Sequence, residues 1–153
     1  MSDDGPVRPI EILLIEDDPG DVLLTTEAFQ SSKVTNELRV ISDGAEAIEH
    51  LRAQADAGVV PDLVLLDLNL PKVSGPEILE FIKSDPRLRR VPVVVLTTSA
   101  AEEDIVRSYD RHANAYVTKP VDVDRFLDVV RQIDHFYLTV VQLPRAGDAT
   151  GPS

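Results

Sequence analysis

Residues 10–18 read IEILLIEDD, a short apolar run that ends in three consecutive acids. The pattern returns at residues 63–67, LVLLD, and at residues 91–99, where VPVVVL leads to three hydroxyl residues. Strands that are apolar along nearly their whole length are buried on both faces, as in a parallel sheet covered by helices. These three runs therefore predict an α/β domain whose polar residues follow the strands.

Segments with helical spacing separate the strands and complete the pattern. We predict helices at 21–30, 43–55, 75–83, 102–112 and 122–138, and shorter strands at 38–41 and 115–117. The alternation gives five βα units, which favours a doubly wound, flavodoxin-like, five-stranded parallel sheet, (βα)5. We expect one folded domain at 10–138, an apolar extension at 139–144, and disordered ends at 1–9 and 145–153.

Composition narrows the classes of function. The chain has 153 residues, no cysteine, and 15 Lys plus Arg against 27 Asp plus Glu, for a net charge of −12. The lack of cysteine excludes disulfides and fits a reducing cytosol, so we expect a cytoplasmic protein. The negative charge argues against nucleic acid as a direct partner, and no apolar run is long enough to span a bilayer.

Chemically active side chains follow four of the predicted strands. Glu16 and Asp17 follow the first strand, Asp67 the third, Thr97 the fourth, and Lys119 the fifth. Ligands of such folds bind beyond the carboxyl ends of the strands, so we expect these groups to share one site. Clustered carboxylates favour a hard divalent cation such as Mg²⁺, beside which a carboxylate can attack a phosphoryl group.

Each of these pieces taken singly has a plainer interpretation. An acid after a strand is more often a helix cap, and Asp67 before Leu68 and Asn69 is more often a turn residue. Thr97-Thr98-Ser99 is an ordinary cap cluster, and a lone Lys-Pro is an ordinary turn. The combination, with every piece at a strand end and in this order, favours the shared site.

Three segments resemble the signature segments of the response-regulator receiver domain. They are residues 12–19 (ILLIEDDP), 62–71 (DLVLLDLNLP) and 116–120 (YVTKP), and the likeness extends over about residues 10–133. The resemblance implies a switch that accepts a phosphoryl group from a sensor histidine kinase and signals through protein contacts. It also implies that the protein turns over no outside substrate, and catalyses only its own phosphorylation and dephosphorylation.

The resemblance assigns a role to each residue of the site. Asp67 is the phospho-acceptor, while Glu16, Asp17, Asp67 and the Asn69 backbone carbonyl hold Mg²⁺, for which Mn²⁺ or Ca²⁺ can substitute. The remaining roles are phosphoryl binding by Thr97, Thr98 and Lys119, switching by Thr97 and Tyr116, tuning of hydrolysis by Asn69 and Ser99, and a cis bond before Pro120.

A narrower resemblance concerns the partner. Residues 19–22, 96–99, 102–105, 107–110 and 136–144 resemble those of lone receivers that partner bacterial phytochrome histidine kinases. His112 departs from the glycine that is commoner in receivers, but it touches no functional position. The resemblance implies a phytochrome-type kinase as the partner.

The apolar C-terminal segment needs a surface to bury it. It folds back on its own domain or forms a homodimer, and we favour a dimer built on the fourth helix, fifth strand and fifth helix. The expected dimer residues are Phe126, Val130, Ile133, Phe136, Tyr137, Leu138 and Val141.

Other functions compete with the phospho-switch. An aspartyl-phosphate phosphatase of the haloacid dehalogenase type needs a second Asp two residues after the nucleophile, where this chain has Asn69. A nucleotide or flavin binder needs a glycine-rich phosphate loop, and none follows a strand. A DNA-binding regulator needs a further domain and a basic surface. A phosphate sink and a constitutive protein-binding module remain open.

Overall fold

The computed structural model describes residues 9–30, 36–99, 101–102, 113, 115–122 and 124. Within these residues the chain alternates strands and helices, as predicted. The elements are β1 (Ile10–Ile15), α1 (Pro19–Gln30), β2 (Asn36–Ile41), α2 (Gly44–Asp56), β3 (Leu63–Asp67), α3 (Gly75–Ser84), β4 (Val93–Thr97) and β5 (Ala115–Thr118).

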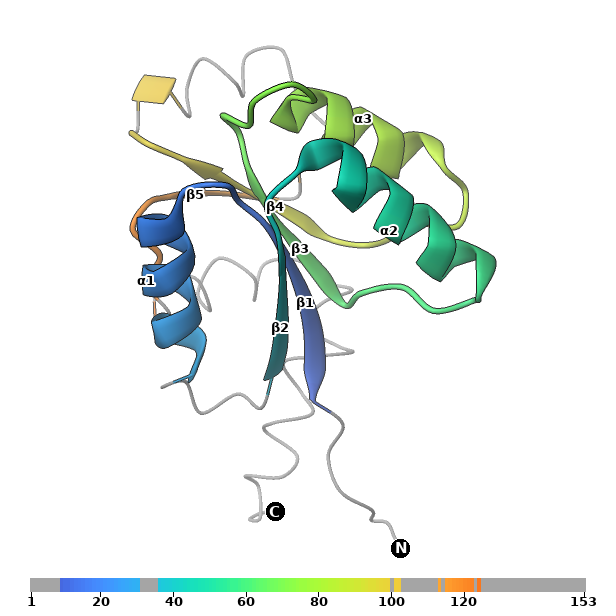
Figure 1. Ribbon diagram of the computed structural model, residues 1–153, viewed down its shortest axis with the longest axis horizontal. Coiled ribbons are helices and arrows are strands. Elements are labelled where there is room, and N and C mark those ends of the chain that lie inside the picture. Colours follow the sequence, from blue (N-terminus) through green and yellow to red (C-terminus); the bar gives the residue numbers. More distant parts are fainter. Residues whose placement is uncertain are drawn as a thin grey trace, which may run out of the picture.

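The five strands form one parallel sheet in the order β2-β1-β3-β4-β5. The chain starts in the interior at β1, moves out to β2, and then returns past β1 to β3 (Figure 1). This reversal makes a switch point beside β1 and β3, where ligands of doubly wound folds bind. The prediction of a flavodoxin-like, doubly wound sheet is confirmed.

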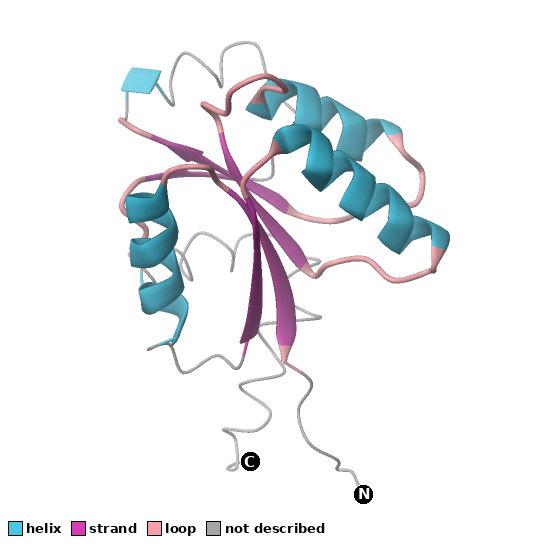
Figure 2. Ribbon diagram, viewed as in Figure 1, coloured by secondary structure: helices cyan, strands magenta, loops and turns pink. Residues whose placement is uncertain are grey.

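Helices cover both faces of the sheet, with α1 on one side and α2 and α3 on the other (Figure 2). The core accordingly has two parts. On one face Phe29 of α1 packs with the side chains of Ile12 and Leu65, and on the other Leu51 of α2 packs with those of Leu13 and Leu66. All residues of β3 and β4 are buried, which explains why these strands are apolar without alternation.

Local signals in the sequence fix where the helices begin. Asp43 caps α2 by accepting hydrogen bonds from the N–H groups of Ala45 and Glu46. Ser74 and Glu77 form a reciprocal capping box at the start of α3. Gly75 is required there, because a Cβ atom at this position would lie 2.7 Å from the backbone oxygen of Asp67. The glycine thus lets α3 start directly against the end of β3.

The starts of three elements differ from the predictions by two residues, and the other bounds differ by at most one residue. Strand β2 begins at Asn36 and not at residue 38, since it is an edge strand and tolerates exposed polar residues. Strand β4 begins at Val93 and not at residue 91, because Pro92 has no N–H to donate to a ladder. Helix α1 begins at Pro19, a residue suited to the first helical position.

Several predicted features lie outside the described residues. These are most of the predicted helices 102–112 and 122–138, the segments 1–8 and 139–153, His112, and all seven expected dimer residues. Residue 102, the first of the fourth predicted helix, is helical, and so is residue 101 before it. Among the described residues, no helix has the length and apolar character needed to cross a membrane.

Candidate functional site

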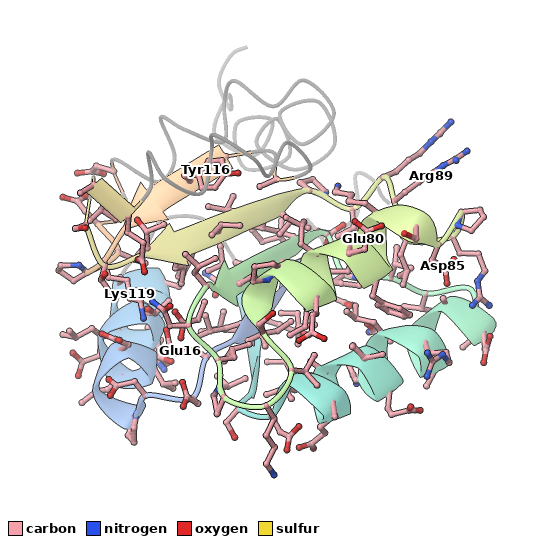
Figure 3. The ribbon with its side chains drawn as sticks, turned by 90° about the horizontal axis from the view of Figure 1, so that it is seen from above. Glu16, Glu80, Asp85, Arg89, Tyr116 and Lys119 are labelled. Carbon is pink, nitrogen blue, oxygen red and sulfur yellow. The ribbon has the colours of Figure 1, made fainter. Side chains whose placement is uncertain are left out.

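The carboxyl ends of the parallel strands bring the predicted site residues together. Glu16 follows β1 directly, Asp67 ends β3 and Thr97 ends β4, and these three side chains are almost fully buried. Lys119 follows β5, and its backbone N–H donates to the Thr97 carbonyl at 2.8 Å, which ties the two strand ends together. In Figure 3, Glu16 and Lys119 point toward each other beside the start of α1.

Three carboxylates form the centre of the site. Glu16, Asp17 and Asp67 each offer an oxygen, and these oxygens all lie within 4.8 Å of one another. Burial raises the pKa of Glu16 to about 7, against the opposing effects of the Lys119 and Asp18 hydrogen bonds. A cluster that is costly to keep fully ionised is one that a cation stabilises.

Lys119 is the ammonium group that contacts this cluster. Its Nζ lies 2.9 Å from Glu16 Oε1, 2.9 Å from Asp21 Oδ2 and 3.2 Å from Asp67 Oδ1. Burial by itself would lower the pKa of Lys119, but the hydrogen bonds to Asp21 and Glu16 outweigh it, and the pKa is raised. Lys119 therefore stays charged at neutral pH and orients the Asp67 carboxylate.

The residues present fit a divalent cation. Glu16, Asp17, Asp21 and Asp67 bring four carboxylates to the neighbourhood of one ammonium group, so the ionised site keeps an excess of negative charge. Oxygen ligands of this kind suit Mg²⁺ and Mn²⁺. Glu16, Asp17 and Asp67 are the side chains that would hold such an ion.

Asp21 was missed by the sequence reasoning, which assigned it only to a helix. It lies in the first turn of α1, and Asp18 receives its N–H in a capping hydrogen bond of 2.8 Å. The spacing of four residues from Asp17 to Asp21 was the available signal, because residues four apart share a helix face. No pattern along the chain indicates that Lys119 contacts Asp21 on this face of α1.

The Thr97 hydroxyl differs from the other hydroxyl groups described for this site in its burial and its hydrogen bonding. Its side chain is fully buried, and its Oγ1 has no hydrogen-bond partner among the described residues. A buried hydroxyl without a partner costs free energy of about 1–3 kcal/mol. Such a group at the end of β4 is suited to donate to a ligand at the site.

Thr98, Ser99 and Asn69 are exposed, and Glu102 engages all three. The Thr98 N–H and Oγ1 donate to Glu102 Oε1 at 2.6 and 2.9 Å, and Asn69 Nδ2 donates to Glu102 Oε2 at 2.8 Å. The Ser99 hydroxyl accepts from the Glu102 N–H at 3.1 Å, which is the bond of a helix cap. Glu102 is thus a second residue of this neighbourhood that sequence reasoning missed, since it was placed in a predicted helix and in the narrower resemblance and was given no role in the site.

Two predicted features lie at the β5 side of the site. The Lys119–Pro120 peptide bond is cis, as the resemblance implied. The Tyr116 side chain, labelled in Figure 3, is 7% exposed and packs in the core cluster with Val95 and Leu66. An inward movement of this ring on phosphorylation stays a prediction.

Comparison with known proteins identifies the family. Residues 12–131 match the model of the response regulator receiver domain. The chain belongs to that family. It is 43% identical over 148 residues to the response regulator Rcp1 of Synechocystis sp., a match that covers 95% of this chain and all of Rcp1.

Solved receiver structures support the same assignment. The bacteriophytochrome response regulator AtBRR is 42% identical with a TM-score of 0.75, over 81% of this chain and 91% of that one. The phosphorylated cyanobacterial phytochrome response regulator RcpA is 45% identical with a TM-score of 0.66, over 86% and 96%. The Mn²⁺-bound form of Rcp1 is 42% identical with a TM-score of 0.64, over 86% and 96%. This receiver is therefore related to phytochrome response regulators.

Proposed function

We propose that this receiver is a phosphorylation switch in which Asp67 accepts a phosphoryl group from a sensor histidine kinase. One observation carries the proposal: the Asp67 carboxylate is 2% exposed, ends a central strand, and lies 3.2 Å from the charged Lys119 ammonium. An acid that only capped a turn would need neither this burial nor this partner.

The transfer step follows from the geometry. An Asp67 oxygen attacks the phosphorus of a phosphohistidine, so that a P–O bond forms while the P–N bond breaks and the imidazole leaves with the electron pair. Lys119 stabilises the negative charge on the phosphoryl oxygens, and the Thr97 hydroxyl donates to one of them. The protein returns to its starting state when water hydrolyses the acyl phosphate.

A divalent cation, Mg²⁺ in the cell, is proposed as the cofactor. When bound it neutralises charge on the phosphoryl oxygens and on the attacking carboxylate. Glu16, Asp17 and Asp67 supply oxygen ligands, and the Asn69 backbone carbonyl is the further ligand that the family implies. The Mn²⁺-bound form of Rcp1 and the phosphorylated form of RcpA support this reading.

The partner that the relatives favour is a phytochrome-type histidine kinase. The similarity to AtBRR, RcpA and Rcp1 supports this choice. Output then passes through protein contacts, with Thr97 and Tyr116 as the switch pair.

Asn69 and Ser99 flank the site where water attacks, and neither is a carboxylate that could act as a base. The acyl phosphate is therefore expected to have a moderate lifetime.

The test is the intact mass of the protein after incubation with Mg²⁺ and acetyl phosphate. We expect a gain of one phosphoryl group, which disappears with a chelator and in Asp67→Asn. The matched control is Asp62→Asn, which changes an acid immediately before β3, at the opposite end of that strand from Asp67, and should keep the gain. A folded protein that gains no mass would contradict the proposal and favour a constitutive protein-binding module.

A further inference from the structure

Glu102 is held at the edge of the site by donors from two different loops. Its Oε1 accepts from the Thr98 N–H at 2.6 Å and from the Thr98 hydroxyl at 2.9 Å. Its Oε2 accepts from the Asn69 side-chain amide at 2.8 Å. Both carboxylate oxygens are thus engaged, one by the loop after β4 and the other by the loop after β3.

The two loops are those that border Asp67. Asn69 lies two residues beyond Asp67, and its N–H donates to Asp67 Oδ1 at 3.3 Å. Thr98 follows Thr97, whose hydroxyl is buried without a partner among the described residues. The hydrogen-bond donors near Asp67 therefore fall into two groups. The Thr97 hydroxyl has no partner among the described residues, whereas the Thr98 N–H and the Asn69 side-chain amide already donate to the Glu102 carboxylate.

Glu102 holds these donors as an anion. Partial burial would raise the pKa of its carboxyl group, but the hydrogen bonds from Thr98 and Asn69 outweigh that effect, and the pKa is lowered. The Lys119 ammonium acts in the same direction. A carboxylate with short charge-assisted hydrogen bonds resembles a phosphoryl group in charge sign and in the donors that it prefers.

We propose that Glu102 is an internal competitor of the phosphoryl group, which occupies the Thr98 N–H and Asn69 amide donors until phosphorylation of Asp67 displaces it. This inference rests on the proposed function of Asp67. A phosphorylated Asp67 carries further negative charge toward the same donors, and the Thr98 backbone has a single N–H, for which the two mutually repelling anions compete. Glu102 is in this sense a positioning residue, since it sets the resting arrangement of Thr98 and Asn69.

The competition has a measurable consequence. Fluoroberyllate binds carboxylates in the place of a phosphoryl group, so with Mg²⁺ it probes the same donors without a covalent step. Removing Glu102 removes both the competing anion and its repulsion. We expect Glu102→Ala and Glu102→Gln to bind fluoroberyllate about tenfold more tightly than the wild type, which is the effect of one hydrogen bond to a charged group.

The control variant is Glu80→Gln. Glu80 is an exposed acid on α3 that accepts a hydrogen bond from Ser84 at 3.0 Å, and it lies away from Lys119 in Figure 3. The substitution removes the same charge from the protein without touching the site. We expect its affinity for fluoroberyllate to equal that of the wild type.

Amide NMR supplies a readout that a merely structural role would not move. In the wild type, the Asn69 side-chain amide protons should move on fluoroberyllate binding toward their position in ligand-free Glu102→Ala, because the displaced carboxylate no longer accepts from them. If Glu102 only anchored the loop, this bond would persist and these protons would not move toward that position. The isosteric Glu102→Gln keeps the loop packed and guards against a result caused by misfolding.

The outcomes separate this inference from the proposed function. If the wild type binds fluoroberyllate and both Glu102 variants bind it equally well or more weakly, Glu102 only anchors the loop and the inference is overturned while the switch stands. If the wild type binds no fluoroberyllate and gains no phosphoryl mass, the proposed function and this inference fail together.

Discussion

Two lysines, Lys119 and Lys83, show how differently this fold uses the same side chain. Lys83, near the end of α3, donates to the backbone carbonyls of Arg89 at 3.1 Å and Val91 at 2.9 Å. Lys119 contacts carboxylates instead, from Glu16, Asp21 and Asp67. Burial lowers the pKa of Lys83, whereas the carboxylate partners raise the pKa of Lys119 despite its burial.

The difference supports the proposal that Lys83 serves structure and Lys119 serves the chemistry of the site. Lys83 closes the turn between α3 and β4, and neutral carbonyls are sufficient partners for that task. Lys119 compensates charge in a cluster that holds more acids than bases, and this excess of acids favours the binding of a cation. If this contrast holds, substitutions at the two lysines and at their partners should differ in size of effect.

The largest effect is expected from Lys119→Met. Loss of the ammonium group that is proposed to stabilise the phosphoryl oxygens should slow phosphorylation by acetyl phosphate about 100-fold. Lys83→Met is the matched control, and its rate should stay within about twofold of the wild type since it lies outside the site. Equal losses in the two variants would remove the contrast between the lysines.

A second prediction concerns the excess of acids around Lys119. Mg²⁺ bound only by the native cluster should stabilise the fold by about 1.4 kcal/mol at ten times its Kd. For a chain of this size the melting temperature should rise by roughly 3–6 °C, measured by thermal unfolding with and without chelator.

Asp17→Ala and Asp43→Ala separate metal binding from stability. Asp17→Ala removes a ligand of the cluster and should abolish the Mg²⁺-dependent rise. Asp43→Ala removes the cap of α2, so it should lower stability by about 1 kcal/mol and keep the full rise. A rise that persists in Asp17→Ala would place the cation elsewhere.

Lys83 and Lys119 should contribute to the pH dependence of stability with opposite signs at alkaline pH. The pKa of Lys83 is lowered in the folded state, so its contribution to stability grows as pH rises toward the unfolded value of 10.5. The pKa of Lys119 is raised, so its contribution is fully present below 10.5 and is lost as pH rises through the higher folded value. Urea unfolding of the wild type and both methionine variants across this range measures the two slopes, and slopes of one sign would contradict the account.

The smallest effect is expected from Asp21→Asn. Asp21 is partly exposed, and Lys119 keeps Glu16 and Asp67 as partners, so stability should fall by less than about 1 kcal/mol. The phosphorylation rate should stay within about threefold of the wild type. A loss as large as that of Lys119→Met would mean that Asp21, and not Asp67, is the partner that matters.

Much of the fold could be predicted from the sequence because the strands are apolar on both faces. Residues 63–67 and 93–97 admit no other simple interpretation, and each leads into a site residue. Strand β2 was predicted too short, because its exposed residues Asn36 and Glu37 carry no apolar signal. A continuous apolar run reveals a strand that is buried on both faces, whereas an edge strand with exposed polar residues has no such run to mark its ends.

The residues of the candidate site likewise include some that the sequence predicts and some that it does not. Glu16, Asp17, Asp67, Thr97 and Lys119 were predicted because strand ends converge in a parallel sheet. Asp21 and Glu102 were not, since Asp21 contacts Lys119 and Glu102 contacts Asn69 across elements that are far apart in the chain. The reach from Asp21 to Lys119, or from Glu102 to Asn69, depends on strand order and helix orientation, which no spacing along the sequence encodes.

The central claim is that Asp67 itself carries the phosphoryl group. Borohydride reduces an acyl phosphate on aspartate to homoserine, so reduction after incubation with Mg²⁺ and acetyl phosphate marks the acceptor in a peptide map. We expect homoserine at position 67 alone, and none when a chelator is present during the incubation. Homoserine at Asp17 or Asp21, or phosphate that survives on a serine or threonine, would contradict it.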